Sequence, residues 1–266
     1  MIRGLLVLDE NLASSIALRY AGQLSAYMPI QFKAAHVEDP SNSKRTVGTG
    51  WVQRTWEKGI EDAGIQTVQR LIKTEKVGCQ FLGAPQVFIG NRDDELLEAL
   101  SQGNYDLFVE GNLNTSNVND FYNLINAKLY SKSKRLMLIV KNLVNPGKIV
   151  LICGDGVDPD ILVPQFVKFI KETSFISIDL LFYKFQESDS PVLLAKTEGG
   201  SAFSKIEEML QENDIKIHDN KVVCGTPEQT ANLFRGYGLA FTTFPTRKSV
   251  RLELLANIPT PIILCR

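Results

Sequence analysis

Two aspartates in this sequence stand directly after apolar runs of strand length. Asp9 follows one such run near the start, and Asp155 lies between Gly154 and Gly156 after another. Ligands of open α/β sheets bind at the carboxyl ends of strands, so both carboxylates are placed where they could contact a small molecule. The alternative is structural, because an aspartate there can cap the next helix and the two glycines can simply permit a turn.

Two glycines mark a pattern that occurs twice. Gly90 and Gly225 each end a short apolar run and precede a polar stretch that opens a helix, and a second apolar run follows. Glycine lets main-chain N–H groups approach an anion closely, and the helix after it adds its positive end. Because the two glycines lie half a chain length apart, the pattern predicts one fold written twice.

Basic residues gather at two places. Arg247, Lys248 and Arg251 lie close together late in the chain and could hold an anion. The pattern favours a solvated helix face for this trio, because charge runs usually face water. We expect the same of a basic run that precedes the fifth apolar segment, formed by Lys132, Lys134 and Arg135.

Other chemistry has no support in the residue pattern. The four cysteines are far apart in sequence and the two histidines lie in different halves, so no spacing for zinc or for a redox pair is present. No nucleophile elbow and no His-Glu-x-x-His pattern occurs. Gly199, Gly200 and Ser201 resemble a phosphate loop but lack its lysine. We therefore expect no catalytic residues and no metal site.

The totals are those of a globular protein. The chain has 266 residues, of which 44% are hydrophobic and 22% charged, with a net charge of -1. A charge so near zero offers no electrostatic basis for binding nucleic acid. No apolar run reaches the ~18 residues of a membrane span, and the first apolar run is too short for a signal peptide. We expect no membrane partner and a cytoplasmic location.

Apolar runs alternate with segments of helical period along the whole chain. Both halves read βαβαβαβαβ, which predicts two doubly wound, parallel-sheet domains of the Rossmann-like, adenine nucleotide alpha hydrolase-like class in tandem. We expect the domains at 1–143 and 147–266, joined by a turn with Pro146. The expected strands are 5–8, 32–37, 87–89, 107–109 and 136–140, then 149–153, 178–183, 222–224, 239–243 and 261–265.

Three features resemble a known family: the acid after the first strand (Asp9), the strand–glycine–helix run at Gly90, and the strand that enters a loop at Gly111. Each half is similar to a universal stress protein domain, so the chain resembles a tandem universal stress protein. In nucleotide-binding members the acid meets adenine, main chain after the second strand contributes, and a Gly-x2-Gly-x9-Gly-Ser/Thr pattern wraps the phosphates.

The resemblance implies a nucleotide site in the first half at Asp9, Val37, Gly90, Gly111 and Asn114. Asn114 stands where the second glycine belongs and can adopt similar backbone angles. The last Gly-Ser pair is replaced by Leu124 and Ile125, so the first phosphate cradle is damaged.

The second half departs further from the pattern. Its equivalent positions are Gly154, Asp155, Gly225 and Arg247, with Phe244 in the place of the first glycine and Arg247 in that of the second. The resemblance therefore implies that its phosphate cradle is lost and that this domain is the more degenerate of the two.

We expect a stress-response protein that acts by binding ATP or AMP in the first half, or by binding a protein partner. The two domains would pack as an intramolecular pseudo-dimer, and a further homodimer stays open. The alternative is a nucleotide-dependent enzyme, a weak ATP hydrolase or nucleotidyl transferase, for which the available acids are Asp9, Asp39 and Glu110.

Overall fold

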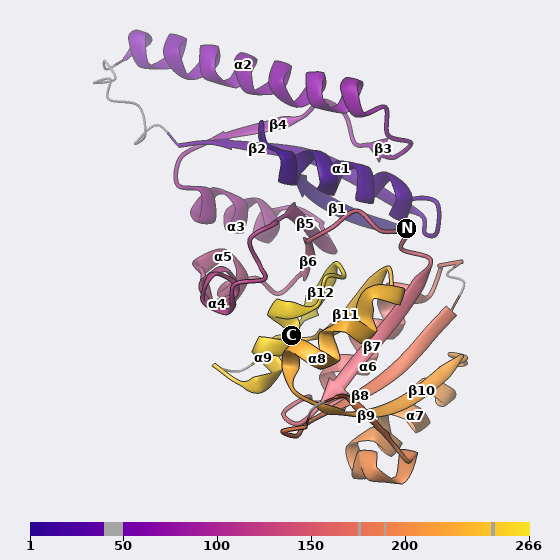
Figure 1. Ribbon diagram of the computed structural model, residues 1–266. Helices are drawn as coiled ribbons and strands as arrows, with labels where there is room; N and C mark the ends of the chain where they lie inside the picture. The colour runs from indigo at the N-terminus through magenta and orange to yellow at the C-terminus, as the bar shows by residue number, and fades with distance from the viewer. Residues whose placement is uncertain (40–49, 175–176, 189, 246–247) are drawn as a thin grey trace.

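The computed structural model describes residues 1–39, 50–174, 177–188, 190–245 and 248–266, and leaves the side chain of residue 52 undescribed. Its strands form a single sheet that runs through the whole molecule (Figure 1). The strands are β1 (Ile2–Val7), β2 (Ile30–Glu38), β3 (Gln80–Phe81), β4 (Gln86–Ile89), β5 (Leu107–Gly111), β6 (Leu136–Val140), β7 (Lys148–Gly154), β8 (Ser177–Phe185), β9 (Val192–Leu194), β10 (Asp219–Gly225), β11 (Leu239–Thr243) and β12 (Ile262–Cys265).

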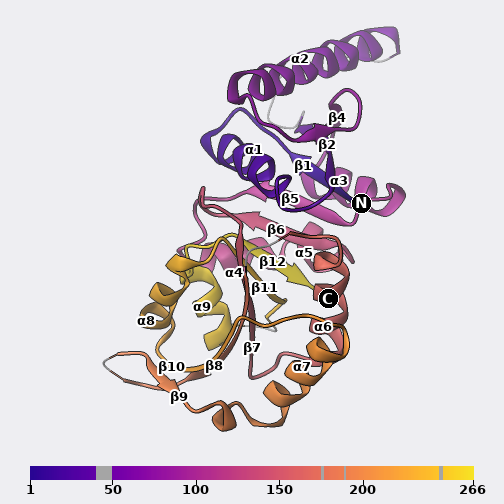
Figure 2. The ribbon, with the colours of Figure 1, turned by 90° about the vertical axis from the view of Figure 1, so that its right-hand side faces the viewer.

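Helices connect these strands and cover both faces of the sheet, as Figure 2 shows. They are α1 (Leu12–Leu24), α2 (Trp51–Glu75), α3 (Arg92–Gln102), α4 (Val118–Asn126), α5 (Lys128–Lys132), α6 (Pro159–Ile170), η2 (Lys196–Gly199), α7 (Gly200–Glu212), α8 (Pro227–Ala231), η3 (Asn232–Gly236) and α9 (Val250–Asn257). Within the described residues, no helix combines the length and apolar content needed to cross a membrane.

The strand order is the same in both halves. The first half reads β4-β2-β1-β5-β6 and the second reads β10-β8-β7-β11-β12, with every neighbour in these two series parallel. The sequence prediction of a doubly wound parallel α/β fold is therefore confirmed. The halves differ at their outer edges, because β3 adds a short second segment beside β2 and β9 adds an antiparallel strand beside β10.

The two halves meet where β6 pairs antiparallel with β12. Leu138 lies opposite Ile263, flanked by the pairs Ile139–Ile262 and Met137–Leu264. Since Val140 and Cys265 end equivalent strands, Leu138 and Ile263 are equivalent positions that pair with each other. The contact has the self-complementary form of a two-fold interface between identical subunits.

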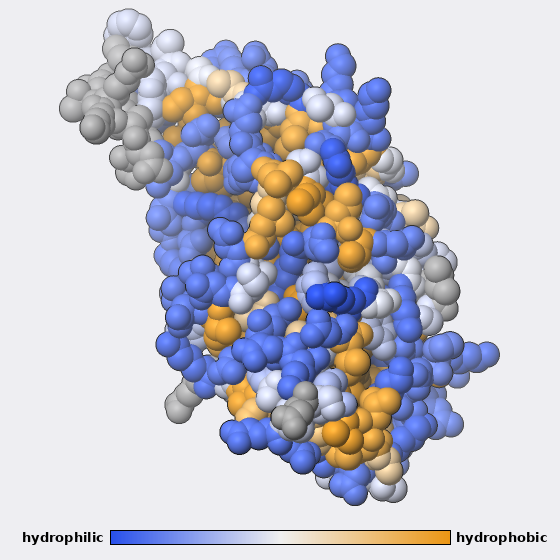
Figure 3. Space-filling view, viewed as in Figure 1, coloured by the Kyte–Doolittle hydropathy of each residue, from blue (hydrophilic) through white to orange (hydrophobic). Residues whose placement is uncertain are grey.

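Two continuous apolar cores lie on the two faces of the sheet and cross this seam. One face is covered by α1, α2, α6 and α7, and the other by α3, α4, α5, α8 and α9. Both cores contain residues of both halves, so neither half completes its own packing alone. On the face seen in Figure 3, apolar residues surface in separate groups, one over α1 and one in the lower part of the second half.

Each half places one basic side chain against a helix of the other half. Lys141, directly after β6, donates from Nζ to the main-chain oxygens of Leu255, Ala256 (3.1 Å) and Ile258 (3.3 Å) at the end of α9. Arg266, directly after β12, donates from Nη2 to the main-chain oxygen of Tyr130 in α5 (3.2 Å). Burial lowers the pKa of Lys141 to about 7, so its amino group is only partly charged at neutral pH, and each half caps a helix of the other chiefly through these hydrogen bonds.

Several element boundaries differ from the sequence prediction. The helical segment predicted between the strands 107–109 and 136–140 is two helices, α4 and α5, and the one between 222–224 and 239–243 is α8 followed by the 3-10 helix η3. The strands β3 and β9 were not predicted, because each is only two or three residues long and lacks a buried apolar run. Cys153, Cys224 and Cys265 are buried free thiols, as their apolar surroundings predicted.

Candidate functional site

The two places where a doubly wound sheet binds ligands are its topological switch points. In the first half this point lies between the carboxyl ends of β1 and β5, and in the second between those of β7 and β11. At each point the connections from the two neighbouring strands leave toward opposite faces of the sheet. The structure can therefore be compared with the predicted sites at two equivalent positions.

At the first switch point Asp9 contacts His36 and has a structural role as well. The carboxylate Oδ1 of Asp9 lies 3.0 Å from Nδ1 of His36, and Nε2 of His36 lies 3.2 Å from Oε1 of Glu38. The hydrogen bond with Asp9 is the main cause that raises the pKa of His36 to about 9, against the opposing effect of burial. A protonated imidazole donates from both nitrogens, so this histidine is held between two carboxylates.

The turn around Asp9 also fixes the start of α1. Asn11 accepts a hydrogen bond from the main-chain N–H of Ser14 (2.8 Å), and the N–H of Asp9 donates to Oγ of Ser14 (2.8 Å). Asn11 is therefore the N-cap of α1, and Asp9 belongs to the turn before it.

Beside this turn, a second charged group closes the end of β5. The Glu110 carboxylate is buried and accepts hydrogen bonds from the guanidinium of Arg92, in the first turn of α3, and from the hydroxyl of Tyr130. Burial raises the pKa of Tyr130 well above its ordinary value, so that this hydroxyl keeps its proton and donates. The positive charge of Arg92 is thus already neutralised by the protein.

The residues expected to form the phosphate cradle of the first half have structural roles. A Cβ at Gly111 would lie 2.0 Å from the main-chain oxygen of Ala13, so this glycine allows α1 to pack on β5. Asn114 does not have the positive φ that the sequence comparison suggested, and its N–H donates to Oδ1 of Asn112 (3.1 Å). Both residues are explained by local packing and turn formation.

Val37 and Gly90 lie on the neighbouring strands. Val37 is half-buried on β2 opposite Phe88, and the N–H of Gly90 donates to the main-chain oxygen of Glu38 (3.0 Å). The five residues predicted for the first half are thus spread over the ends of four strands and one loop, and a charged network lies among them.

The second switch point is hollow. A cavity of about 260 Å³ is lined by the turn Gly154, Asp155 and Gly156 after β7, by Tyr183 and Phe185 of β8, and by Ser249, Val250 and Arg251 at the start of α9. Gly156 has a φ of +76°, which favours glycine because other residues are strained there. Two of the predicted second-half residues, Gly154 and Asp155, therefore line a real cavity.

Arg251 is the unusual residue of this cavity. Its guanidinium is only 7% exposed and donates to Oγ1 of Thr243 (3.0 Å) and to the main-chain oxygen of Phe244 (2.9 Å). Both partners are neutral, and within the described ranges no carboxylate forms an ion pair with it. Burial lowers the pKa of Arg251 to about 10, which still leaves it charged at neutral pH.

The other predicted second-half residues do not join it. Arg247 lies outside the described residues. Gly225 is structural, because its oxygen accepts from the Tyr183 hydroxyl (3.0 Å) and a Cβ there would lie 2.9 Å from Oγ1 of Thr230. Gly111 pairs with Val140 at the end of β6, and Thr243 pairs with Cys265 at the end of β12. Thr243 is therefore the residue equivalent to Gly111, and the predicted match at Phe244 is wrong by one residue.

Sequence reasoning missed the burial of Arg251, since it treated the basic trio as a solvated helix face. Lys248 does fit a surface position, with its Nζ 5.2 Å above the Tyr122 ring of the first half. Sequence reasoning also missed Arg92 and His36. A signal existed for Glu110, because it is an ionisable residue inside an otherwise apolar strand. Among the described residues, no group of three or more metal-ligating side chains is gathered.

Comparison with known proteins supports the fold. No family model and no curated protein matches the chain. Among solved structures, the chain is similar to a universal stress protein from Archaeoglobus fulgidus DSM 4304, with a TM-score of 0.60 at 16% identity, covering 99% of this chain and 96% of that one. It is also similar to the functionally unknown protein PA1789 from Pseudomonas aeruginosa PAO1, with a TM-score of 0.55 at 11% identity, covering 99% and 92%.

These matches extend over both halves of the chain, and at such identities they establish a shared fold. The class defined by the sheet and its connections is the doubly wound α/β protein. Within that class, the fold is like that of the universal stress proteins.

Proposed function

We propose that this protein is a tandem universal stress protein in function, acting in a stress response by binding and not by catalysis. Its two domains, 1–143 and 147–266, form an intramolecular pseudo-dimer. The second half holds the phosphate of an adenine nucleotide at the second switch point. The common fold and the equal strand order support the architecture, and the hollow second switch point supports the ligand.

The observation that carries this proposal is Arg251, a buried arginine that lines the cavity and whose guanidinium has two neutral hydrogen-bond partners. Burying a charge is costly unless an opposite charge compensates it. Arginine binds phosphate in a planar, two-pronged geometry, so a phosphate group is the anion that would complete this site.

The remaining lining fits a nucleoside monophosphate. The main chain around Gly156 approaches the cavity without side-chain obstruction, and Phe185, which is 50% exposed, offers an aromatic ring on which a base can stack. Asp155 is exposed on the rim and would repel a longer polyphosphate. We therefore propose AMP in preference to ATP as the ligand.

The first half is the weaker candidate for the nucleotide because its own residues supply the anion. Glu110 already neutralises Arg92, and Asp9 already contacts His36. A nucleotide would have to displace these ion pairs before it could bind.

Calorimetric titration of the full chain with AMP, and separately with ATP, tests the proposal. Arg251→Met removes the charge while keeping an apolar stem, and replacing a buried charge in this way is commonly neutral or stabilising. We expect AMP affinity to fall at least about tenfold in Arg251→Met, since one charge-assisted contact is lost. Arg235→Met, at an exposed arginine of η3, is the matched control and should bind as the parent does.

Asp9→Ala separates the two halves. Loss of AMP binding in Asp9→Ala with retention in Arg251→Met would move the site to the first half. Silence with both nucleotides would overturn the nucleotide proposal and leave a protein partner as the function. ATP turnover that depends on Asp9 would support the nucleotide-dependent enzyme instead.

A further inference from the structure

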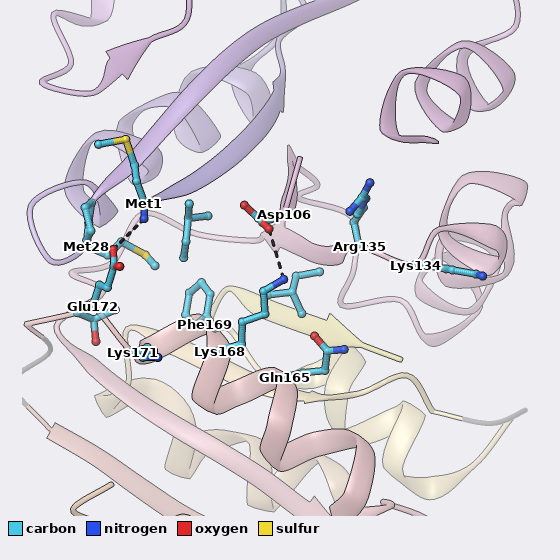
Figure 4. A pocket seen from close by; sticks show the side chains of 14 residues that line it. Met1, Met28, Asp106, Lys134, Arg135, Gln165, Lys168, Phe169, Lys171 and Glu172 are labelled. Atoms are coloured by element: carbon cyan, nitrogen blue, oxygen red, sulfur yellow. Dashed lines mark hydrogen bonds and ion pairs between the residues drawn. The ribbon is translucent and has the colours of Figure 1, made fainter. Parts of the chain in front are cut away.

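A second cavity lies at the sheet edge opposite the first switch point. Its volume is about 250 Å³, and it separates the amino ends of β1, β5 and β6 from α6 of the second half (Figure 4). Residues of both halves line it, including Ile2 and Leu136 on one side and Lys168 and Phe169 on the other. We call it the inter-half cleft.

The floor of the inter-half cleft is apolar and firmly held. Met28 is 3% exposed, Phe169 is 2% exposed and Leu136 is 8% exposed. The Phe169 ring also packs against that of Phe241, with ring centroids 5.6 Å apart. Figure 4 shows Phe169 between the two ion pairs that span the cleft, Met1 with Glu172 and Asp106 with Lys168. A ligand would find a preformed apolar surface here.

The lining has an excess of positive charge. Four side-chain cations line the cleft against two carboxylates, the cations being Lys134, Arg135, Lys168 and Lys171. Both carboxylates are engaged: Oδ2 of Asp106 accepts from the N–H of Arg3 (3.2 Å), and Glu172 contacts the Met1 ammonium (2.8 Å).

Lys168 is the cation best placed to contact a ligand. Its Nζ lies 3.4 Å from Oδ1 of Asp106, which is a long contact, and its side chain is 72% exposed. Exposed ion pairs of this kind contribute little to stability, so Lys168 can turn to another anion at small cost. Asp106 would keep its hydrogen bond from the Arg3 N–H. In Figure 4, Lys134 and Arg135 extend away from Lys168. They can therefore attract an anionic ligand at Lys168 only through longer-range electrostatics.

We propose that the inter-half cleft binds a small amphipathic organic anion, a carboxylate or sulfonate whose apolar body rests on Met28 and Phe169 while Lys168 contacts its charge. The volume is just below the usual ~300–1,000 Å³ of ligand pockets, which limits the body to a small ring system or a medium-length acyl chain. Because the cleft is formed by both halves, such a ligand stabilises their association.

Fluorescence titration of the full chain with 8-anilinonaphthalene-1-sulfonate tests this proposal. We expect one saturable site, displacement by octanoate, and weaker binding at high salt because an exposed charge contributes. Lys168→Glu should weaken binding at least about tenfold, since like charges now face each other. Lys132→Glu, at an exposed lysine of α5 that does not line the cleft, is the matched control and should bind normally.

Two further measurements make the outcome decisive. The neutral analogue N-phenyl-1-naphthylamine should bind at least about tenfold more weakly than the sulfonate. Equal affinity of the neutral and charged probes, or equal behaviour of Lys168→Glu and Lys132→Glu, would overturn the proposal. Arg251→Met should leave sulfonate binding unchanged and AMP should not displace the probe, so this site and the nucleotide site fail or succeed independently.

Discussion

The two switch points of this molecule occupy equivalent places in equivalent halves but treat charge in opposite ways. In the first half a buried carboxylate, Glu110, neutralises Arg92, and Asp9 pairs with His36. In the second half, Arg251 is buried beside a cavity with neutral partners. The half that supplies its own counter-charge has a filled switch point, and the half that does not has a cavity beside its buried arginine.

Removing Glu110 should give the largest effect on stability. Glu110→Leu leaves the Arg92 guanidinium and the buried Tyr130 hydroxyl without their acceptor, which should cost about 3 kcal/mol in free energy of unfolding. The equivalent second-half position is Thr242, whose Oγ1 donates to the main-chain oxygen of Ile152 (2.8 Å). Thr242→Val should cost only about 1 kcal/mol. Urea denaturation followed by circular dichroism measures both, and equal losses would contradict the asymmetry.

The next largest effect should be a pH dependence of the free energy of unfolding that arises from the first half. The pKa of His36 is raised to about 9 from 6.5, so its stabilisation is complete below pH 6.5 and is lost as pH rises through 9. After allowance for the exposure of Asp9 and Glu38, we expect a loss of about 2 kcal/mol over this range.

His36→Gln should remove this dependence from the urea midpoint between pH 6 and 10. His218→Gln is the control, since His218 is exposed and lies away from the switch point. A His36→Gln profile with the same slope as the parent's over this range would show that His36 is not held as an imidazolium, since the opposite effect of Lys141, whose pKa burial lowers to about 7, is common to both proteins.

A carboxylate placed beside Arg251 should turn the second switch point into a copy of the first. Thr243→Glu supplies a counter-charge next to the guanidinium, so AMP affinity should fall about tenfold, equivalent to about 1.4 kcal/mol. Thr243→Gln has nearly the same shape without the charge and should retain most of the affinity. Calorimetric titration compares the two variants, and equal affinities would mean that shape and not charge controls this site.

The smallest effects on stability should appear at the seam between β6 and β12, where Lys141 of the first half is half-buried and Arg266 of the second half is exposed. Lys141→Met removes the donor to three main-chain oxygens at the end of α9 and should cost about 1 kcal/mol. Arg266→Met removes one such bond from an exposed side chain and should cost about 0.5 kcal/mol. Thermal unfolding of both variants would test this order, and a larger loss for Arg266→Met would reverse it.

Much of the fold could be predicted because its signals are local. Glycine-terminated apolar strands at Gly90 and Gly225 identified equivalent positions, which strand pairing confirms through Gly90 beside Glu38 and Gly225 beside Phe185. The site was harder to predict. Whether Arg251 faces water or the cavity depends on how α9 packs. The partner of Arg92 is Glu110 of β5, and the sequence around Arg92 does not indicate that partner.

The central place of β6 has a consequence for how the chain is made. All five residues of β6 are buried in the finished molecule, and one edge of the strand is covered by β12, which follows it much later in the chain. Until the ribosome releases that segment, the nascent first half carries a bare apolar strand edge, which is a template for unwanted association.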